Sequence, residues 1–345
     1  MSIKRSVALA VSAFPTLADA GTRAERAGFD RAWTTELRSR DAVARAQHVG
    51  SHTSSLLVGT GIAYAFTRHP MAMVAAAVEA SAAVGGRLTL GIGAGTDHTR
   101  GEFGIEFDHP ATRLAEYLAV MRAALDSDGG LEHHGRFYDV SMPGFAFGHP
   151  RELLDGVRLY AAALMPTALR LLSREADGIA LHPFGHVERY LDQVVLPVSE
   201  EAAGSVGRTG PSIAAWMVSC ALEDGEEARA LARAQIALYA AQPGFAAFFE
   251  HTPWAGCAAS VRARVDLVRG RVPWRELGSE LVPDEMLDGL AAAGTPEEVV
   301  EAVVAKERQL SRQGVDELTL QVPGIALPAE RTDAVLDGLV DALAR

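Results

Sequence analysis

The chain has 345 residues, of which 48% are hydrophobic, and its formal net charge is −12 at pH 7. A core of this size fits one α/β barrel with insertions as well as two domains. An acidic surface repels phosphate backbones, so we expect no nucleic-acid partner. The two cysteines, Cys220 and Cys257, offer neither a disulfide framework nor metal-ligand spacing, which indicates a reduced, cytoplasmic protein.

The first twenty residues imitate a secretory signal peptide that ends in Ala18-Asp19-Ala20. The apolar run is short, however, and Pro15 follows it directly, at a place that suits the first turn of a helix. We therefore expect this segment to be the first strand and helix of the fold. No apolar run reaches the roughly 20 residues that a membrane span needs, so we expect no membrane association.

Short apolar strands alternate with longer helical segments along the chain. The predicted strands are 6–11, 31–35, 56–63, 88–92, 157–163, 178–181, 212–221 and 318–322. The predicted helices are 15–27, 41–52, 70–84, 110–125, 166–176, 187–199, one from Glu226, and 329–343. Helices between strands imply parallel pairing, and eight such units favour a (β/α)8 TIM barrel formed by one domain, residues 1–345. No dinucleotide fingerprint follows the first strand, which weakens the case for an open sheet.

Two stretches are additional to the eight strand–helix units of a minimal barrel. Residues 126–150, after strand four and its helix, predict a long loop with a small hairpin. Residues 242–294, between helix seven and strand eight, contain five large aromatic residues: Phe245, Phe248, Phe249, Trp254 and Trp274. Long insertions in a barrel serve as lids or as packing caps, and the aromatic residues fit an apolar substrate or a core equally well.

A glycine-rich stretch, residues 85–96, follows the pattern of a buried strand that enters a loop. An apolar run from Arg87 to Ile92 precedes Gly93-Ala94-Gly95. Glycines at the carboxyl end of a strand let a planar ligand lie close to the backbone, although an ordinary turn has the same pattern.

Several short motifs occur in a definite order along the chain. They are Gly28-Phe-Asp-Arg-Ala-Trp-Thr-Thr-Glu36, Val58-Gly-Thr-Gly-Ile62, Thr67-Arg-His-Pro70, the stretch from Gly85 to Gly95, Arg113…Glu116-Tyr117, Tyr160-Ala-Ala-Ala-Leu-Met-Pro166, Ala176-Asp-Gly178, Leu181-His-Pro-Phe184, Thr295-Pro-Glu-Glu298 and Gly314-Val-Asp-Glu-Leu318. This ordered set resembles the bacterial luciferase-like family of flavin and deazaflavin oxidoreductases. The resemblance implies a homodimer of (β/α)8 barrels with the cofactor at the C-terminal mouth. Thr67-Arg-His-Pro70 and His182-Pro-Phe184 are most similar to the branch that uses coenzyme F420, a deazaflavin.

The predicted cofactor contacts come from three loops. Pro166 suits the first position of a helix, where the free N–H groups of Thr167 and Ala168 and the helix dipole favour a phosphate. The resemblance extends this site to Leu164 and Met165. It also implies a non-prolyl cis peptide between Gly61 and Ile62, bulging against the cofactor ring, and contacts from Gly93, Ala94 and Gly95.

The catalytic candidates are Glu36, His69 and Asp97. Glu36 ends the second strand, where the family has an acidic residue often followed by histidine; this chain has Leu37, which leaves the proton donor open. His69 also fits a structural role near a helix start. Arg68 is a candidate for binding a carboxylate or a phosphate.

Neither a metal site nor a hydrolase elbow fits the sequence, because it has neither HExxH nor GxSxG spacing. The expected function is hydride transfer between coenzyme F420 and a small organic substrate. An FMN-dependent monooxygenase and a non-catalytic flavin-binding barrel are the alternatives.

Overall fold

The computed structural model describes residues 3–9, 13–105, 108–325 and 327–344. The chain forms two compact units. The first unit comprises Met1–Asp30, Leu181–Leu196 and Ala214–Arg345, and the second comprises Arg31–Ala180 and Pro197–Ile213. The expectation of one domain from residue 1 to 345 stays a prediction.

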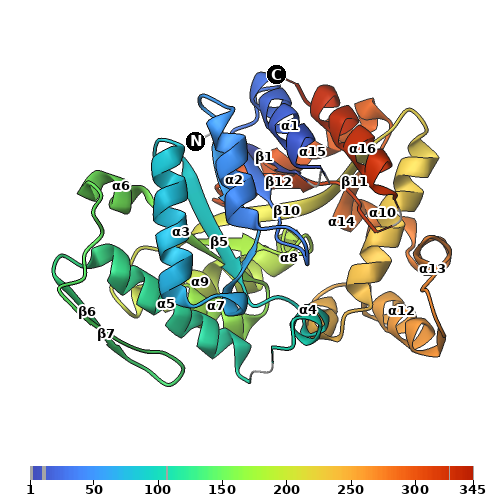
Figure 1. Ribbon diagram of the computed structural model, residues 1–345. Coiled ribbons are helices and arrows are strands. Elements are labelled where there is room, and N and C mark those ends of the chain that lie inside the picture. Colours follow the sequence, from blue (N-terminus) through green and yellow to red (C-terminus); the bar gives the residue numbers. More distant parts are fainter. Residues whose placement is uncertain (1–2, 10–12, 106–107, 326, 345) are drawn as a thin grey trace. The chain divides into compact units, whose positions relative to one another are not determined.

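The first unit holds a parallel sheet in the order β11-β10-β12-β1. Its strands are β1 (Lys4–Leu9), β10 (Ser212–Ala221), β11 (Ala291–Gly294) and β12 (Glu317–Gln321). Its helices are α1 (Phe14–Arg26), α8 (Glu188–Tyr190), a π-helical turn (Leu191–Val195), α10 (Gly225–Ala240), a 3₁₀ turn (Pro243–Phe245), α11 (Ala246–Phe249), α12 (Ala255–Leu267), α13 (Trp274–Leu281), α14 (Asp284–Leu290), α15 (Pro296–Arg312) and α16 (Ala329–Ala342). Helix α1 contacts β1, α15 contacts β11, and α16 contacts both α1 and α15 (Figure 1).

The second unit holds the order β2-β3-β5-β8-β9, with β4 paired to β5. Its strands are β2 (Arg31–Thr34), β3 (Leu57–Thr60), β4 (Ala63–Tyr64), β5 (Leu88–Gly93), β6 (Gly130–His134), β7 (Asp139–Pro143), β8 (Arg158–Ala163) and β9 (Gly178–Leu181). Its helices are α2 (Ala42–Ser51), a 3₁₀ turn (Ala65–Thr67), α3 (Pro70–Ala83), α4 (Asp97–Glu102), α5 (Pro110–Asp126), α6 (Arg151–Gly156), α7 (Pro166–Leu172) and α9 (Leu196–Gly204).

The predicted fold class is confirmed. In the described part of the chain, β1, β2, β3, β5, β8, β9, β10 and β12 follow one another with helices between them, as in a (β/α)8 barrel. Both predicted insertions are present. The first contains the antiparallel β6–β7 hairpin, and the second consists of α11 to α14 and β11.

Several element boundaries differ from the prediction. The strand expected over 56–63 is divided into β3 and β4 by the bend at Gly61. The helix expected over 187–199 is three pieces, joined by the π-helical turn. Strand β11 is missing from the prediction because its sequence, Ala-Ala-Ala-Gly, has no β-branched residue. The first predicted strand covers residues 6–11, and its last two residues, 10 and 11, lie outside the described part of the chain.

Helix α15 was also not predicted, although a start signal precedes it. The Thr295 side chain accepts a hydrogen bond from the Glu298 backbone N–H, and the Glu298 carboxylate accepts one from the Thr295 N–H. This reciprocal capping box, with Pro296 in the first turn, satisfies two N–H groups that a helix start leaves free.

The β6–β7 hairpin is fixed to helix α5 by one carboxylate. Glu116 of α5 accepts hydrogen bonds from the backbone N–H groups of Arg136, Phe137 and Tyr138, over 3.1, 2.8 and 2.7 Å. The turn of the hairpin therefore lies against α5 (Figure 1). Glu116 belongs to a motif of the resemblance, and here it holds an insertion in place.

Glycines allow β2, β3 and β5 to pack around the buried Trp33. A Cβ at Gly59 would lie 2.6 Å from the Trp33 ring, and a Cβ at Gly91 would lie 2.1 Å from the Thr60 carbonyl oxygen. The Thr60 hydroxyl donates to the Gly91 carbonyl over 2.7 Å and accepts from the Gly91 N–H over 2.9 Å. No side chain can occupy position 59 or 91 unless the strands move apart.

We expect Gly91→Ala to destabilise the protein by about 3 kcal/mol, because a methyl group would overlap a backbone atom that cannot rotate away. Urea unfolding of the purified protein measures the change. Gly204→Ala is the matched control: it lies at the end of α9 with no atom within 4 Å of its Cβ position, so stability should be unchanged or higher by at most about 1 kcal/mol. Equal stabilities for Gly91→Ala and wild type would contradict this packing.

Candidate functional site

The loop after β3 bends at Gly61–Ile62, where the peptide bond is cis. The Gly61 N–H donates to the Thr34 carbonyl oxygen over 2.7 Å, and the Glu36 N–H donates to the Ile62 carbonyl oxygen over 3.1 Å. These two bonds fix the bend to the carboxyl end of β2. The cis bond lies where the resemblance implies one.

The Ile62 side chain explains why residue 93 is glycine. A Cβ at Gly93 would lie 2.1 Å from Ile62 Cδ1, so the room beside this glycine is filled by a side chain of the protein itself. This differs from the sequence-based expectation of room for a planar ligand. Gly95 has a φ of 72°, a left-handed conformation that glycine adopts without strain. The expected cofactor contacts of Gly93, Ala94 and Gly95 stay predictions.

Glu36 lies two residues past β2 and is 7% exposed. Its Oε1 forms an ion pair with the Arg68 guanidinium. Its Oε2 is buried without a hydrogen-bond partner among the described residues. Burial raises the pKa of this carboxyl, and the nearby charge of Arg68 opposes the rise. A buried carboxylate oxygen without a hydrogen bond destabilises the folded state. Oε2 is therefore free to accept a hydrogen bond from a ligand.

Arg68 is held by its neighbours within the second unit. The Asp41 carboxylate lies 3.2 Å from its guanidinium, which also contacts Met73 Sδ over 3.6 Å. The Tyr117 hydroxyl donates to the Arg68 carbonyl oxygen over 3.3 Å. The sequence suggested Arg68 as an anion-binding residue; in the structure, its charge is paired with Glu36 and Asp41.

The other two catalytic candidates do not join Glu36 in one described cluster. His69 is the N-cap of α3, and its Nδ1 accepts the Met71 N–H over 3.3 Å. Its ring is exposed and meets the Tyr138 ring edge-on. Helix α4 begins at Asp97, but the side chains of Asp97 and His98 lie outside the described part of the structure. Catalytic roles for His69 and Asp97 stay predictions.

Helix α7 begins without a side-chain cap. Met165 is its N-cap residue, with extended backbone and no capping hydrogen bond, and Pro166 occupies the first turn. The first helical bond runs from the Leu169 N–H to the Met165 carbonyl oxygen over 3.0 Å. The N–H groups of Thr167 and Ala168 precede that bond, so they are available to an external acceptor. Leu164 is buried behind this turn, whereas Thr167 is exposed.

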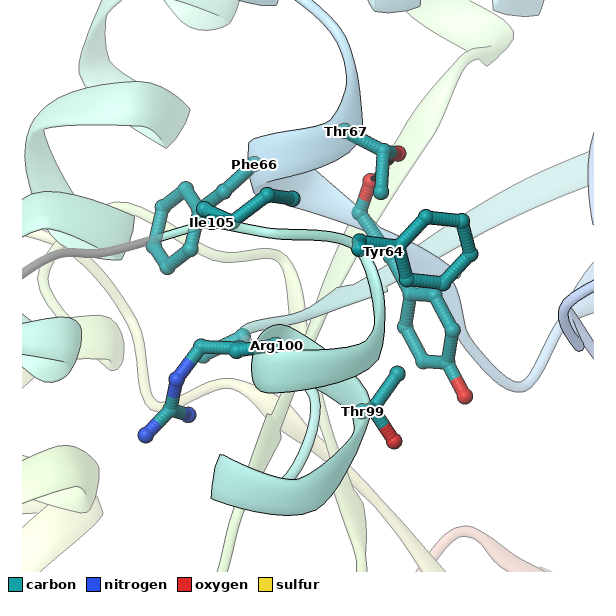
Figure 2. Close-up of a pocket in the computed structure, with 8 residues that line it drawn as sticks. Tyr64, Phe66, Thr67, Thr99, Arg100 and Ile105 are labelled. Atoms are coloured by element: carbon teal, nitrogen blue, oxygen red, sulfur yellow. Dashed lines mark hydrogen bonds between the residues drawn. The ribbon is translucent and has the colours of Figure 1, made fainter.

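Tyr64, which the sequence analysis did not select, lines a small cavity two residues past the cis bond. The cavity is about 10 Å³, room for one water molecule, and is too small for a cofactor. Figure 2 shows six of the residues that line it, Tyr64, Phe66, Thr67, Thr99, Arg100 and Ile105, with Ile105 beside Phe66. Burial raises the pKa of Tyr64, and a hydrogen bond with Thr99 opposes the rise. The proximity of Tyr64 to Gly61 in the sequence is the signal that could have identified it.

Within the described residues, no group of three or more His, Cys, Asp or Glu side chains is placed to hold a metal ion. Among the helices described, none is both long and apolar enough to cross a membrane.

Glu36→Gln keeps the shape of the side chain and removes its charge. The folded state has the higher Glu36 pKa and binds more protons than the unfolded chain, so this carboxyl makes stability fall as pH rises above its ordinary value of 4.5. We expect the stability of Glu36→Gln relative to wild type to increase between about pH 5 and about pH 8. Urea unfolding at both pH values measures this. The control Glu223→Gln, at an exposed position, should show the same pH dependence of stability as wild type. A stability difference between Glu36→Gln and wild type that is the same at both pH values would contradict the raised pKa.

The chain is similar to proteins of known family over most of its length. Residues 3–313 match the family model described as luciferase-like monooxygenase. An uncharacterized protein of Mycobacterium tuberculosis is 30% identical over 298 residues, which cover 83% of this chain and 85% of that protein. The 5,10-methylenetetrahydromethanopterin reductase of Methanolobus tindarius is 25% identical over 283 residues, covering 80% and 81%.

Two solved structures share the fold. The coenzyme F420 dependent tetrahydromethanopterin reductase from Methanopyrus kandleri superposes with a TM-score of 0.77 at 19% identity, covering 99% of this chain and 98% of that one. The oxygenating constituent of 3,6-diketocamphane monooxygenase from Pseudomonas putida, in complex with FMN, has a TM-score of 0.66 at 16% identity, covering 100% and 98%. Because the family model spans most of the sequence, the chain belongs to the luciferase-like monooxygenase family.

Proposed function

We propose that this protein is an oxidoreductase that transfers a hydride between coenzyme F420 and a small organic substrate. The observation that carries the proposal is the buried Glu36 carboxyl at the end of β2, whose Oε2 has no described partner. The similarity to the Methanolobus reductase, and the fold shared with the Methanopyrus enzyme, support F420 as the cofactor.

The described residues fit such a cofactor in three places. The N–H groups of Thr167 and Ala168 would hold its phosphate at the start of α7. The backbone at Gly61–Ile62 and at Gly95 would support the ring. Glu36 Oε2 would then gain a hydrogen-bond partner that the described residues do not provide.

Coenzyme F420, when bound, supplies or accepts the hydride. The protein's own contribution is position and proton handling. Leu37 stands where the family often has a histidine, so we assign proton transfer to Glu36. Its raised pKa keeps a proton on the carboxyl closer to neutral pH than on an exposed glutamate, while Arg68 limits how far the pKa rises.

The second candidate is an FMN-dependent monooxygenase. The description of the matching family and the FMN bound to the Pseudomonas protein favour it. A phosphate at the start of α7 would serve FMN as well as F420. A non-catalytic flavin-binding barrel is the third possibility, motivated by Leu37.

We also infer a cytoplasmic protein made of one domain. Both described cysteines are free, Cys220 buried and Cys257 partly exposed, which fits a reducing compartment.

Binding of F420, FMN and FAD to the purified full-length protein tests the cofactor, and Thr167→Asp tests its phosphate position. A carboxylate at a helix start should leave the melting temperature of the ligand-free protein unchanged or slightly raised. Facing a bound phosphate, it should weaken cofactor affinity about ten-fold or more, on the order of 1.4 kcal/mol.

Thr112→Asp is the matched control, because it places the same charge in the first turn of α5. It should leave cofactor affinity unchanged. Preference for FMN would overturn F420 dependence in favour of the monooxygenase, and tight binding without turnover of any tested substrate would favour the non-catalytic barrel. Unchanged affinity in Thr167→Asp would mean that the phosphate lies elsewhere.

We further propose a homodimer that uses helix α3. Met73, Val74, Ala77 and Val78 of α3 are buried within the chain, and the face that remains exposed carries Ala72, Ala75 and Ala76. Small side chains allow another helix to approach closely. Light scattering at micromolar concentration should give twice the chain mass of 36.5 kDa. Ala76→Arg should reduce it to one chain mass, and a wild-type monomer would refute the proposal.

A further inference from the structure

Four rings in the first unit form a cluster that the site above does not use. We name it the aromatic box; it consists of His182, Phe184, Tyr239 and Phe245. The ring of His182 is its centre, with centroids 4.9 Å from Phe184, 4.5 Å from Tyr239 and 4.1 Å from Phe245. His182 directly follows β9, Tyr239 is near the end of α10, and Phe245 opens the 242–294 insertion.

The box presents a face instead of being closed in the core. Phe184 is fully buried and forms its floor, stacked on Phe248 with a centroid separation of 5.5 Å. His182, Tyr239 and Phe245 are each only partly buried. Part of each of these three residues is therefore exposed to solvent.

One hydrogen bond sets the tautomer of His182. Its Nδ1 lies 3.3 Å from the Phe184 backbone N–H, which can only donate, so Nδ1 is the acceptor and carries no proton. In the neutral ring the proton is then on Nε2. Burial lowers the pKa of His182 to about 3, so the ring is neutral at physiological pH.

The Nε2–H of His182 is open to an external acceptor. No hydrogen bond from it is found among the described residues, and it is not one of the buried unpartnered atoms. It therefore reaches the accessible face of the box. A donor of this kind, between aromatic rings, suits a neutral acceptor such as a carbonyl oxygen or a ring nitrogen.

Tyr239 is fixed in place by two glutamines. The Gln321 amide donates to the Tyr239 hydroxyl over 2.6 Å, and Gln235 forms a second hydrogen bond with it. Gln235 Oε1 in turn accepts the Gly324 N–H over 3.0 Å. Since Gln321 is the last residue of β12, the box stands at the carboxyl end of this parallel strand, the end at which (β/α)8 barrels carry their active sites.

We propose that the aromatic box binds the planar, uncharged part of the organic substrate, with the His182 Nε2–H donating to a carbonyl oxygen or ring nitrogen on it. This rests on the proposed function in one respect, because the ligand is taken to be the substrate of that oxidoreductase. The class of substrate that follows is an aromatic or conjugated carbonyl compound, or a neutral heteroaromatic ring.

The test uses acetophenone as the probe, because it combines a flat ring with one acceptor. Titration is followed by NMR of the full-length protein with ¹⁵N-labelled histidine, with the His182 signal assigned from its loss in the variants. We expect an unprotonated Nδ1 and a protonated Nε2, and a shift of the Nε2–H signal on addition of acetophenone. Methyl cyclohexyl ketone, which keeps the carbonyl and lacks the aromatic ring, should bind more weakly.

Two variants separate the hydrogen bond from the shape of the ring. His182→Phe keeps a flat ring and removes the donor, so acetophenone should bind about five-fold more weakly, the loss of one net hydrogen bond. His182→Gln keeps a donor and should bind within about two-fold of wild type. Melting temperatures of both variants show that each is folded.

F420 binding is measured on the same samples. Failure of wild type to bind F420, with the acetophenone results as expected, would overturn the proposed function and leave the ligand site standing. Wild-type acetophenone affinity in a folded His182→Phe, or a His182 signal that acetophenone does not move, would overturn the box, whatever F420 does.

Discussion

The site depends on the absence of side chains at three strand positions. Gly59, Gly91 and Gly93 leave the space that the Trp33 ring, the Thr60 carbonyl and the Ile62 side chain occupy. With these contacts β3 ends at Thr60, the chain bends at Gly61, and β4 continues parallel to β5 toward its carboxyl end. The hydrogen bond from the Glu36 N–H to Ile62 then fixes the end of β2 against the bend. The packing at these three glycines therefore determines the backbone conformation of the site.

Glu36 illustrates how burial and pairing compete at this position. Desolvation favours the protonated acid, and the Arg68 and Asp41 charges act in opposite directions upon it, with desolvation the largest effect. A carboxyl in this balance titrates nearer to neutral pH than an exposed one. Because only Oε1 is engaged by Arg68, the two oxygens have different tasks: one anchors the side chain and the other remains for a ligand.

The repeating part of the fold could be predicted from sequence because each strand is a short apolar run and each helix begins with a local signal such as Pro70, Pro110 or Pro166. Glu36 could be selected because it ends a predicted strand. Its pairing with Arg68 could not, since 32 residues separate them and only the tertiary fold brings them together. The contact between Gly93 and the Ile62 side chain could not be predicted either, since the two residues come from the ends of different strands. Strand β11 could not be predicted because its alanines lack the β-branched or aromatic side chains that are typical of strands.

Strand β11 also affects how the 242–294 insertion can change. The insertion leaves from the end of α10 and returns as β11, which pairs with the last four residues of β10, Val218 to Ala221. Both of its ends are thus attached to a single strand–helix unit. Closing a longer or shorter segment between two fixed points costs little, about 0.6 kcal/mol for each doubling of its length. The whole insertion, which includes Phe245, can therefore be replaced by a different segment in relatives while the eight-strand framework stays the same.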